Sequence, residues 1–121
     1  MAVAVIAVIA VFFLGMGIYA LAAPTALVRP FGITLAQSTS RSEVRAVYGG
    51  FGLAMAAVLA YAAVGTDSHR TGIVITVAAA LAGMAFGRLV SAVVDDRAAF
   101  YPNWFYFGVE AIAAAALLTA A

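Results

Sequence analysis

Residues 71–94 read TGIVITVAAALAGMAFGRLVSAVV, and this stretch decides the fold because it is long, apolar and interrupted by a single charge, Arg88. An α-helix rises about 1.5 Å per residue, so the stretch would extend for about 36 Å. The hydrocarbon layer of a membrane is about 30 Å thick, and a run of roughly 18 or more apolar residues is typical of a helix that crosses it. The stretch therefore predicts a membrane-spanning helix.

Three further runs of the same kind flank this stretch, so we expect spans at residues 3–22, 43–65, 71–94 and 103–121. Across the whole chain 67% of residues are hydrophobic and 9% are charged. A soluble domain has about a quarter of its residues charged, because charged residues cover its surface. We therefore predict a single all-α domain over residues 1–121, folded as an antiparallel four-helix transmembrane bundle.

The composition also excludes several classes of protein. The formal net charge is +1, so the chain offers no basic surface to nucleic acid. The chain contains no cysteine, which removes disulfides, iron–sulfur clusters and cysteine-based zinc sites. Its one histidine, His69, lies outside the predicted spans, which disfavours a haem held by two histidines. We expect neither a cofactor nor a metal.

The first run has an alternative interpretation as a secretory signal peptide, because Ala20, Leu21 and Ala22 resemble a cleavage site. A signal peptide begins with a positively charged region. No Lys or Arg precedes this run. We therefore expect the first helix to be retained in the protein.

The connections between the runs predict the topology. Residues 65–70 are too few to join anything but antiparallel neighbours. An up-and-down order then places the connections 23–39 and 95–102 on one side of the membrane, which we name the near side. The far side carries residues 65–70 and both chain ends.

Arginine positions suggest an orientation. The near side holds Arg29, Arg41 and Arg97, whereas the far side holds Arg70. Cytoplasmic loops carry an excess of positive residues. We therefore expect the near side to be cytoplasmic, with both termini extracytoplasmic, in a multi-pass protein of the bacterial inner (plasma) membrane.

Local signals refine the helix ends. The connection 23–39 contains two prolines but is too apolar for a free loop, and we expect it to lie in the membrane interface. Ser40 and Glu43 have the spacing of a capping box, which predicts that the second helix begins at Ser40. Pro102 suits the first turn of the last helix.

Three charges in or near the spans are the most informative residues. Counted from the near-side ends of their helices, Arg45, Arg88 and Glu110 lie about 7, 10 and 12 Å deep. A charge at the centre of the membrane costs about 2.5 to 3.5 kcal/mol even on the insertion scale, so these groups need partners. An arginine offers a bidentate fork to a carboxylate. We therefore expect an Arg-Glu-Arg cluster in which Glu110 contacts Arg45, Arg88 or both.

Helical spacing extends this cluster, because residues three, four and seven apart share a face. Tyr48 follows Arg45, Ser91 follows Arg88, and Tyr106 precedes Glu110. We predict no catalytic residue, and the candidate ligand-binding residues are Arg45, Tyr48, Arg88, Ser91, Tyr106 and Glu110.

The cluster allows three interpretations. It could be a network that only fixes helix register, a pocket for a ligand or lipid head group, or a path for protons or ions. Two arginines and one glutamate leave one surplus positive charge, which favours an anionic or polar head group. An ion pair between Arg88 and Asp95 would instead neutralise the surplus positive charge without a ligand.

Small residues predict close helix packing. Gly83 and Gly87 form the GxxxG motif of membrane helices within a stripe that includes Ala79 and Ser91. The glycines of residues 49–52 predict the same on the preceding helix. We favour contacts inside the bundle, with homodimerisation as the alternative.

These motifs resemble those of a known family. The sequence RAVYGG at residues 45–50, the motif GRxxS from Gly87 to Ser91, acidic Asp95 and Glu110 are similar to a family of small bacterial four-helix membrane proteins classed as a domain of unknown function. The resemblance covers most of the chain after Thr39. It implies a four-helix membrane fold and a joint role for Arg45, Tyr48, Arg88 and Glu110, and it implies no activity.

Three classes of function follow from these observations. We favour a non-enzymatic membrane protein that binds a lipid or apolar small molecule, or packs as a subunit of a larger membrane complex. Its expected partners are membrane lipids and a second copy or a larger complex. A small dimeric exporter is one alternative, although small multidrug transporters carry their key carboxylate in the first helix. An intramembrane isomerase using Glu110 is the other, but flanking arginines would favour the ionised carboxylate, which is a weak base.

Overall fold

A computed structural model of the chain describes residues 1–65, 68–96, 98 and 100–121, and within these ranges all the regular structure is helical. The prediction of an all-α fold is confirmed. The helical elements in chain order are α1 (Ala2–Ala22), α2 (Pro24–Val28), a 3₁₀ turn (Arg29–Phe31), α3 (Ser38–Val44), a π-helical stretch (Arg45–Gly50), α4 (Phe51–Val64), α5 (Ser68–Val94), a π-helical turn (Phe100–Trp104) and α6 (Phe105–Ala120).

Four helical segments of the described chain are long and apolar enough to cross a membrane, by length and composition. They are Ala2–Ala22, Ser38–Val64, Ser68–Val94 and Phe100–Ala120. Large apolar side chains cover their outer surfaces, and Val8, Val64 and Ile112 are each more than 60% exposed. A helix that is hydrophobic on all sides belongs in lipid or in the core of a larger protein. The chain is therefore built as a membrane protein.

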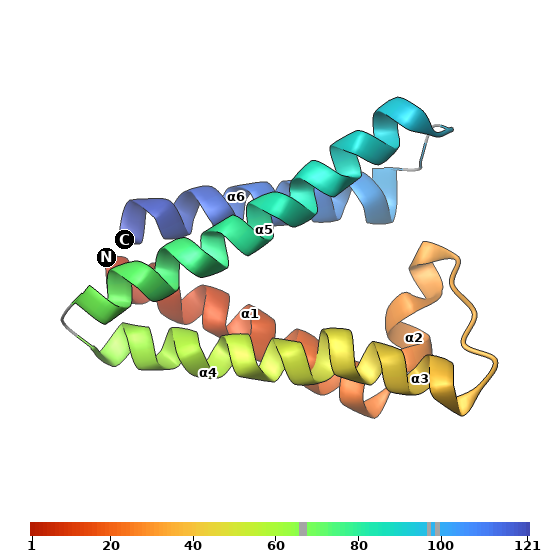
Figure 1. Cartoon of the computed structure of the whole chain (residues 1–121), viewed down its shortest axis with the longest axis horizontal. Coiled ribbons are helices and arrows are strands. Elements are labelled where there is room, and N and C mark those ends of the chain that lie inside the picture. Colours follow the sequence, from red (N-terminus) through yellow and green to blue (C-terminus); the bar gives the residue numbers. More distant parts are fainter. Residues whose placement is uncertain (66–67, 97, 99) are drawn as a thin grey trace.

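The four long helices run up and down as two pairs, α1 with α4 and α5 with α6 (Figure 1). Both chain ends, the C-terminal end of α4 and the N-terminal end of α5 lie together at the left of Figure 1, which is the far side. The segment with α2 and α3 and the C-terminal end of α5 lie at the right, which is the near side. The two pairs meet at the far side and diverge toward the near side. Arg97, which the orientation argument counted on the near side, lies outside the described residues.

The apolar core occupies the far-side half of the bundle. Its cluster of buried residues comes from residues 6–13 of α1, 56–59 of α4, 74–81 of α5 and 114–120 of α6. Ile6, Leu59, Val74 and Leu117 have no exposed surface. All four helices therefore meet in this half of the molecule.

Glycines bring α1 and α4 together. A Cβ atom built on Gly17 would lie 2.9 Å from the carbonyl oxygen of Gly49, and one on Gly52 would lie 3.0 Å from the Cα of Gly17. Such distances leave no room for any side chain. The prediction of close packing at Gly49 and Gly52 is confirmed.

The expectation for the other glycine motif is wrong. A Cβ atom on Gly83 or Gly87 would meet no heavy atom within 4 Å, so these residues are not contact points inside the bundle. The reason is that α5 turns the opposite face, with Val77, Leu81 and Ala85, toward its neighbours. The alternative of homodimerisation through Gly83 and Gly87 stays a prediction.

Two predictions concerned the starts of helices, at Ser40 and at Pro102. The helix predicted to begin at Ser40 begins at Ser38, because Gln37 is extended and its carbonyl accepts the Arg41 N–H at 3.2 Å. The predicted capping box is therefore wrong. Pro102 lies in the stretch Phe100–Trp104, which leads into α6 and is kinked: Tyr101 has non-helical φ and ψ angles of −99° and 130°, and the Tyr101–Pro102 peptide bond is cis.

The connection 23–39 packs back onto the bundle. Pro24 begins α2, and Pro24 and Val28 are buried. Gly32 has a φ of 74°, a left-handed conformation that favours glycine, and its N–H donates to the Arg29 carbonyl at 2.9 Å. This turn places Phe31 against the near-side ends of the long helices.

Candidate ligand-binding site

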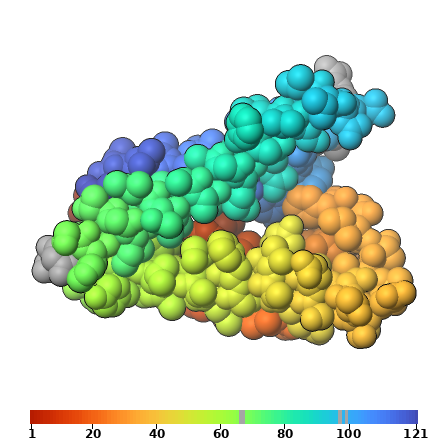
Figure 2. All heavy atoms as spheres, in the orientation of Figure 1, coloured from red at the N-terminus to blue at the C-terminus, as the bar shows by residue number. Residues whose placement is uncertain are grey.

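A cavity of about 430 Å³ lies between the two helix pairs in the near-side half. Figure 2 shows the surface hollowed between α4 and α5 toward this side. Pockets that bind small molecules have volumes of about 300 to 1,000 Å³. The lining is mainly apolar, with residues such as Phe12, Phe13, Met16, Leu27, Phe31, Leu81, Met84 and Val109. The polar members are Tyr19, Tyr48, Arg88, Tyr101, Tyr106 and Glu110.

An ion pair between α5 and α6 forms part of the cavity wall. Arg88 Nε donates to Glu110 Oε1 at 2.8 Å, and Arg88 Nη2 donates to Glu110 Oε2 at 2.9 Å. The Glu110 side chain is 5% exposed and that of Arg88 is 22% exposed. Such bidentate pairs are among the strong hydrogen bonds of proteins. The prediction that Glu110 contacts Arg88 is confirmed. The alternative in which Asp95 neutralises Arg88 is therefore wrong.

Aromatic rings flank the Arg88 guanidinium. Its Cζ lies 5.9 Å from the centre of the Phe31 ring and 5.8 Å from that of Tyr106. The two rings are themselves 5.6 Å apart. A cation over an aromatic face gains about 0.5 to 2 kcal/mol, more when water is excluded. The near-side connection therefore contributes to the site through Phe31.

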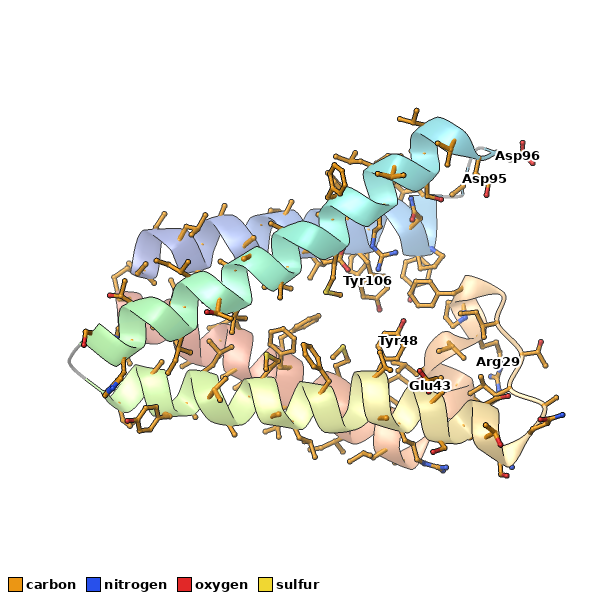
Figure 3. The ribbon with its side chains drawn as sticks, in the orientation of Figure 1. Arg29, Glu43, Tyr48, Asp95, Asp96 and Tyr106 are labelled. Carbon is orange, nitrogen blue, oxygen red and sulfur yellow. The ribbon has the colours of Figure 1, made fainter. Side chains whose placement is uncertain are left out.

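Four of the six candidate residues line this one cavity. They are Tyr48, Arg88, Tyr106 and Glu110. Figure 3 shows Tyr48 and Tyr106 pointing toward one another from the two helix pairs. Ser91 instead lines a separate polar hollow of about 440 Å³ with Asp95, Asp96 and Asn103 at the end of α5. The ligand-binding role of all six residues stays a prediction.

The expected Arg-Glu-Arg cluster is wrong in its third member. Arg45 Nε donates to the Leu21 carbonyl at 3.0 Å and does not line the cavity. Leu21 lies in the last turn of α1, where carbonyls lack an intrahelical partner. Arg45 and Tyr48 were expected on one face because they are three residues apart, but they lie in a π-helical stretch, where the wider turn separates residues at that spacing.

Because Arg45 does not line the cavity, the charge of the site differs from the one expected. Among the residues that the structure describes, one arginine and one glutamate line the cavity, so these residues do not supply the surplus positive charge that favoured an anionic head group. The site is neutral overall and still rich in hydrogen-bonding groups.

Sequence reasoning missed the contribution of α1 and of the near-side connection. Tyr19 of α1 and Phe31 of the 3₁₀ turn both line the cavity, although neither was among the six candidate residues. A signal existed for each. Tyr19 carries the one polar side chain in residues 3–22, and Phe31 belongs to a connection already too apolar for a free loop.

The arrangement is suited to binding. An arginine has five N–H donors, and Glu110 takes two of them, so three remain for a molecule in the cavity. Both Glu110 oxygens accept hydrogen bonds from Arg88, so the carboxylate is already engaged within the protein. Within the described residues, no group of three or more His, Cys, Asp or Glu could hold a metal ion.

The chain matches, over residues 1–121, a family described as a domain of unknown function, DUF4345, and it belongs to that family. Neither a curated protein nor a solved structure matches the chain significantly.

Proposed function

We propose that this member of a family of unknown function binds a small amphipathic molecule drawn from the lipid bilayer. The cavity between the helix pairs would hold the molecule, with its polar group against Arg88 and its apolar body among the aromatic and aliphatic side chains. The observation that carries the proposal is the bidentate Arg88–Glu110 pair in the wall of a mainly apolar cavity. A pair that only fixed helix register would need no cavity beside it.

The charge of the site selects an uncharged polar group. Arg88 and Glu110 neutralise one another, so an anion or cation in the cavity would meet no opposite surplus charge. Glu110 is the central residue of the span Phe100–Ala120 and therefore lies inside the hydrocarbon region. Carrying a charge to that depth costs several kcal/mol, whereas a carbonyl or hydroxyl needs only a hydrogen-bond partner.

The available donors define the complementary chemistry. The three free N–H groups of Arg88 would donate to a carbonyl or hydroxyl oxygen, and the hydroxyls of Tyr48 and Tyr106 can donate or accept. A single-chain ester such as a monoacylglycerol has this combination of a neutral polar head and an apolar tail. We use it as the probe for the class.

The location is proposed on the same grounds as the fold. Four apolar spans suit a multi-pass protein of the bacterial inner membrane, and Arg29 and Arg41 support a cytoplasmic near side with extracytoplasmic termini.

The direct test is ligand retention measured by native mass spectrometry. Wild-type protein in detergent would be incubated with monooleoylglycerol or with oleate, which has a similar chain and a charged head. We expect monooleoylglycerol to remain bound and oleate to be lost. The double variant Arg88→Met/Glu110→Leu removes the polar end without leaving a lone charge, and we expect it to lose the preference between the two probes.

A second variant pair tests the cavity itself. Met84 lines the cavity and is 41% exposed, whereas Leu89 on the same helix does not line it and is 43% exposed. Met84→Trp fills the cavity and should abolish retention, while Leu89→Trp should retain the probe like wild type. Equal retention by both variants, or no retention by wild type, would contradict the proposed function.

A further inference from the structure

A second hollow lies between α1 and the last span. It has a volume of about 840 Å³ and is lined by one face of α1 from Ala4 to Phe12 and one face of the last span from Phe100 to Ala116. Its lining is apolar apart from the indole N–H of Trp104. We name this hollow the α1–α6 groove. A Cβ atom built on Gly108, which lines it, would meet no heavy atom within 4 Å, so the groove is open over bare backbone at this point.

The groove and the ligand cavity share a wall. Phe12 and Val109 line both of them, and they are the residues common to the two linings. Phe12 is 40% exposed, whereas its neighbour Phe13 is 3% exposed in the core. One aromatic and one valine side chain therefore separate the polar cavity from a lipid-facing groove.

The length of the groove fits a hydrocarbon chain. From Val109 to Ala116 the last span rises about 11 Å, and from Phe12 back to Ala4 α1 rises about 12 Å. Glu110 is the central residue of its span, about 15 Å from the near-side end, so a molecule that continued about 11 Å along the groove would end about 26 Å deep. That depth stays within the hydrocarbon layer of about 30 Å.

We infer that the α1–α6 groove is the tail compartment of the same site and holds the single hydrocarbon chain of the molecule whose head lies at Arg88. This inference rests on the proposed function. The two hollows adjoin at Phe12 and Val109, so a thin hydrocarbon chain attached to the head group has only these two side chains to cross. A helix of a second protein is about 10 Å across and could fill the groove without reaching the cavity. Adjacency to the cavity thus favours a chain attached to the head group.

The protein carries its own reporter for this inference. Trp104 is the one tryptophan of the sequence, and it lines the groove. Bromine atoms on an acyl chain quench tryptophan fluorescence on contact. The probe is a monoacylglycerol with a stearoyl chain dibrominated near its ester end, because that end would pass Val109, about 8 Å along the span from Trp104. It is mixed at low fraction into phosphatidylcholine nanodiscs that contain the protein.

We expect quenching of Trp104 to saturate at a low probe fraction in wild type. Gly108→Phe fills the groove, and the open space around this glycine lets the larger side chain enter without a backbone clash. This variant should lose the saturable component. Gly83→Phe is the matched control, because Gly83 also has open space around it but lines neither hollow, and it should quench like wild type.

Quenching that rises linearly with probe fraction and is equal in all three proteins would overturn the inference, because the groove would then meet only bulk lipid. Native mass spectrometry on the same samples separates this failure from that of the proposed function. If wild type retains the probe while quenching stays linear, the tail lies elsewhere and the cavity still binds. If wild type retains no probe, both proposals fail. Circular dichroism and the measured mass show that Gly108→Phe is folded, and Gly108→Leu gives a smaller filler.

Discussion

The far-side and near-side halves of the bundle are built from the same four helices and differ in what lies between them. In the far half the helices meet on a cluster of fully buried aliphatic residues that includes Ile6, Leu59 and Leu117. In the near half the pairs diverge around a cavity of about 430 Å³ whose wall holds the Arg88–Glu110 pair. The comparison teaches that the packed half can hold the fold together while the other half stays hollow.

The largest effect on stability is expected when the ion pair of the near-side half is broken. Glu110→Ala would leave Arg88 as an unpaired charge among apolar side chains, and losing one partner of a buried pair costs about 3 to 5 kcal/mol. The double variant Arg88→Met/Glu110→Leu should stay within about 1 kcal/mol of wild type, since apolar replacement of a buried pair is often neutral. Reversible unfolding in mixed detergent micelles measures both. A Glu110→Ala protein as stable as wild type would show that the Arg88–Glu110 pair does not stabilise the fold.

The next prediction concerns the far half. Leu117 is fully buried in the core cluster, and Leu→Ala changes in packed cores cost about 2 to 5 kcal/mol. Leu27→Ala, in the lining of the near-side cavity, should cost clearly less because the space beside it is already open. The same unfolding measurement compares the two. Equal losses would remove the distinction between a packed and a hollow half.

Glycine substitutions measure how closely α4 and α5 each pack against their neighbours. Gly52→Ala forces a methyl group to within 3.0 Å of the α1 backbone, and such overpacking costs about 1 to 3 kcal/mol. Gly83→Ala meets no atom and should stabilise α5 by up to about 1 kcal/mol, because alanine is the better helix former. Opposite signs in thermal unfolding are the expected result. Destabilisation by Gly83→Ala would instead indicate a contact with a second copy.

The smallest effect is expected at the far-side turn. Arg70 donates to the carbonyls of Ala62 at 3.0 Å, Ala63 at 2.9 Å and Gly65 at 2.6 Å, which closes the C-terminal end of α4. Arg70→Ala should cost about 1 to 2 kcal/mol, less than the sum of three hydrogen bonds, because water can replace the arginine at this end. Hydrogen exchange should rise in the last turn of α4 alone. Faster exchange throughout the bundle would show that the turn supports more than its own helix.

The spans were predictable from sequence because long apolar runs need no knowledge of how helices pack. The Arg88–Glu110 pair was predictable for a related reason: depth along a helix is proportional to residue number, and both charges lie at a similar depth. The direction of a side chain around its helix was not predictable. Arg45 has a matching depth but lies in a π-helical stretch, which turns it to the Leu21 carbonyl.

The orientation of a residue around its helix also explains why the prediction for Gly83 and Gly87 was wrong and why Tyr19 of α1 was not predicted. Gly83 and Gly87 have the spacing for close approach, but spacing does not say which face of α5 meets its neighbours. Tyr19 enters the cavity because α1 packs along α4 and faces α5 and α6 across the hollow, a pairing that short connections alone do not fix.

Solid-state NMR can show whether the head group of a bound molecule contacts Arg88. Monooleoylglycerol labelled with ¹³C at its ester carbonyl would be added to nanodiscs that contain protein with ¹⁵N-labelled arginine, and solid-state NMR would record transfer between the two labels. The account predicts transfer from the carbonyl carbon to the guanidinium nitrogens of Arg88, and its loss in Arg88→Met/Glu110→Leu. A carbonyl that shows no contact with Arg88 while the probe remains bound would contradict it.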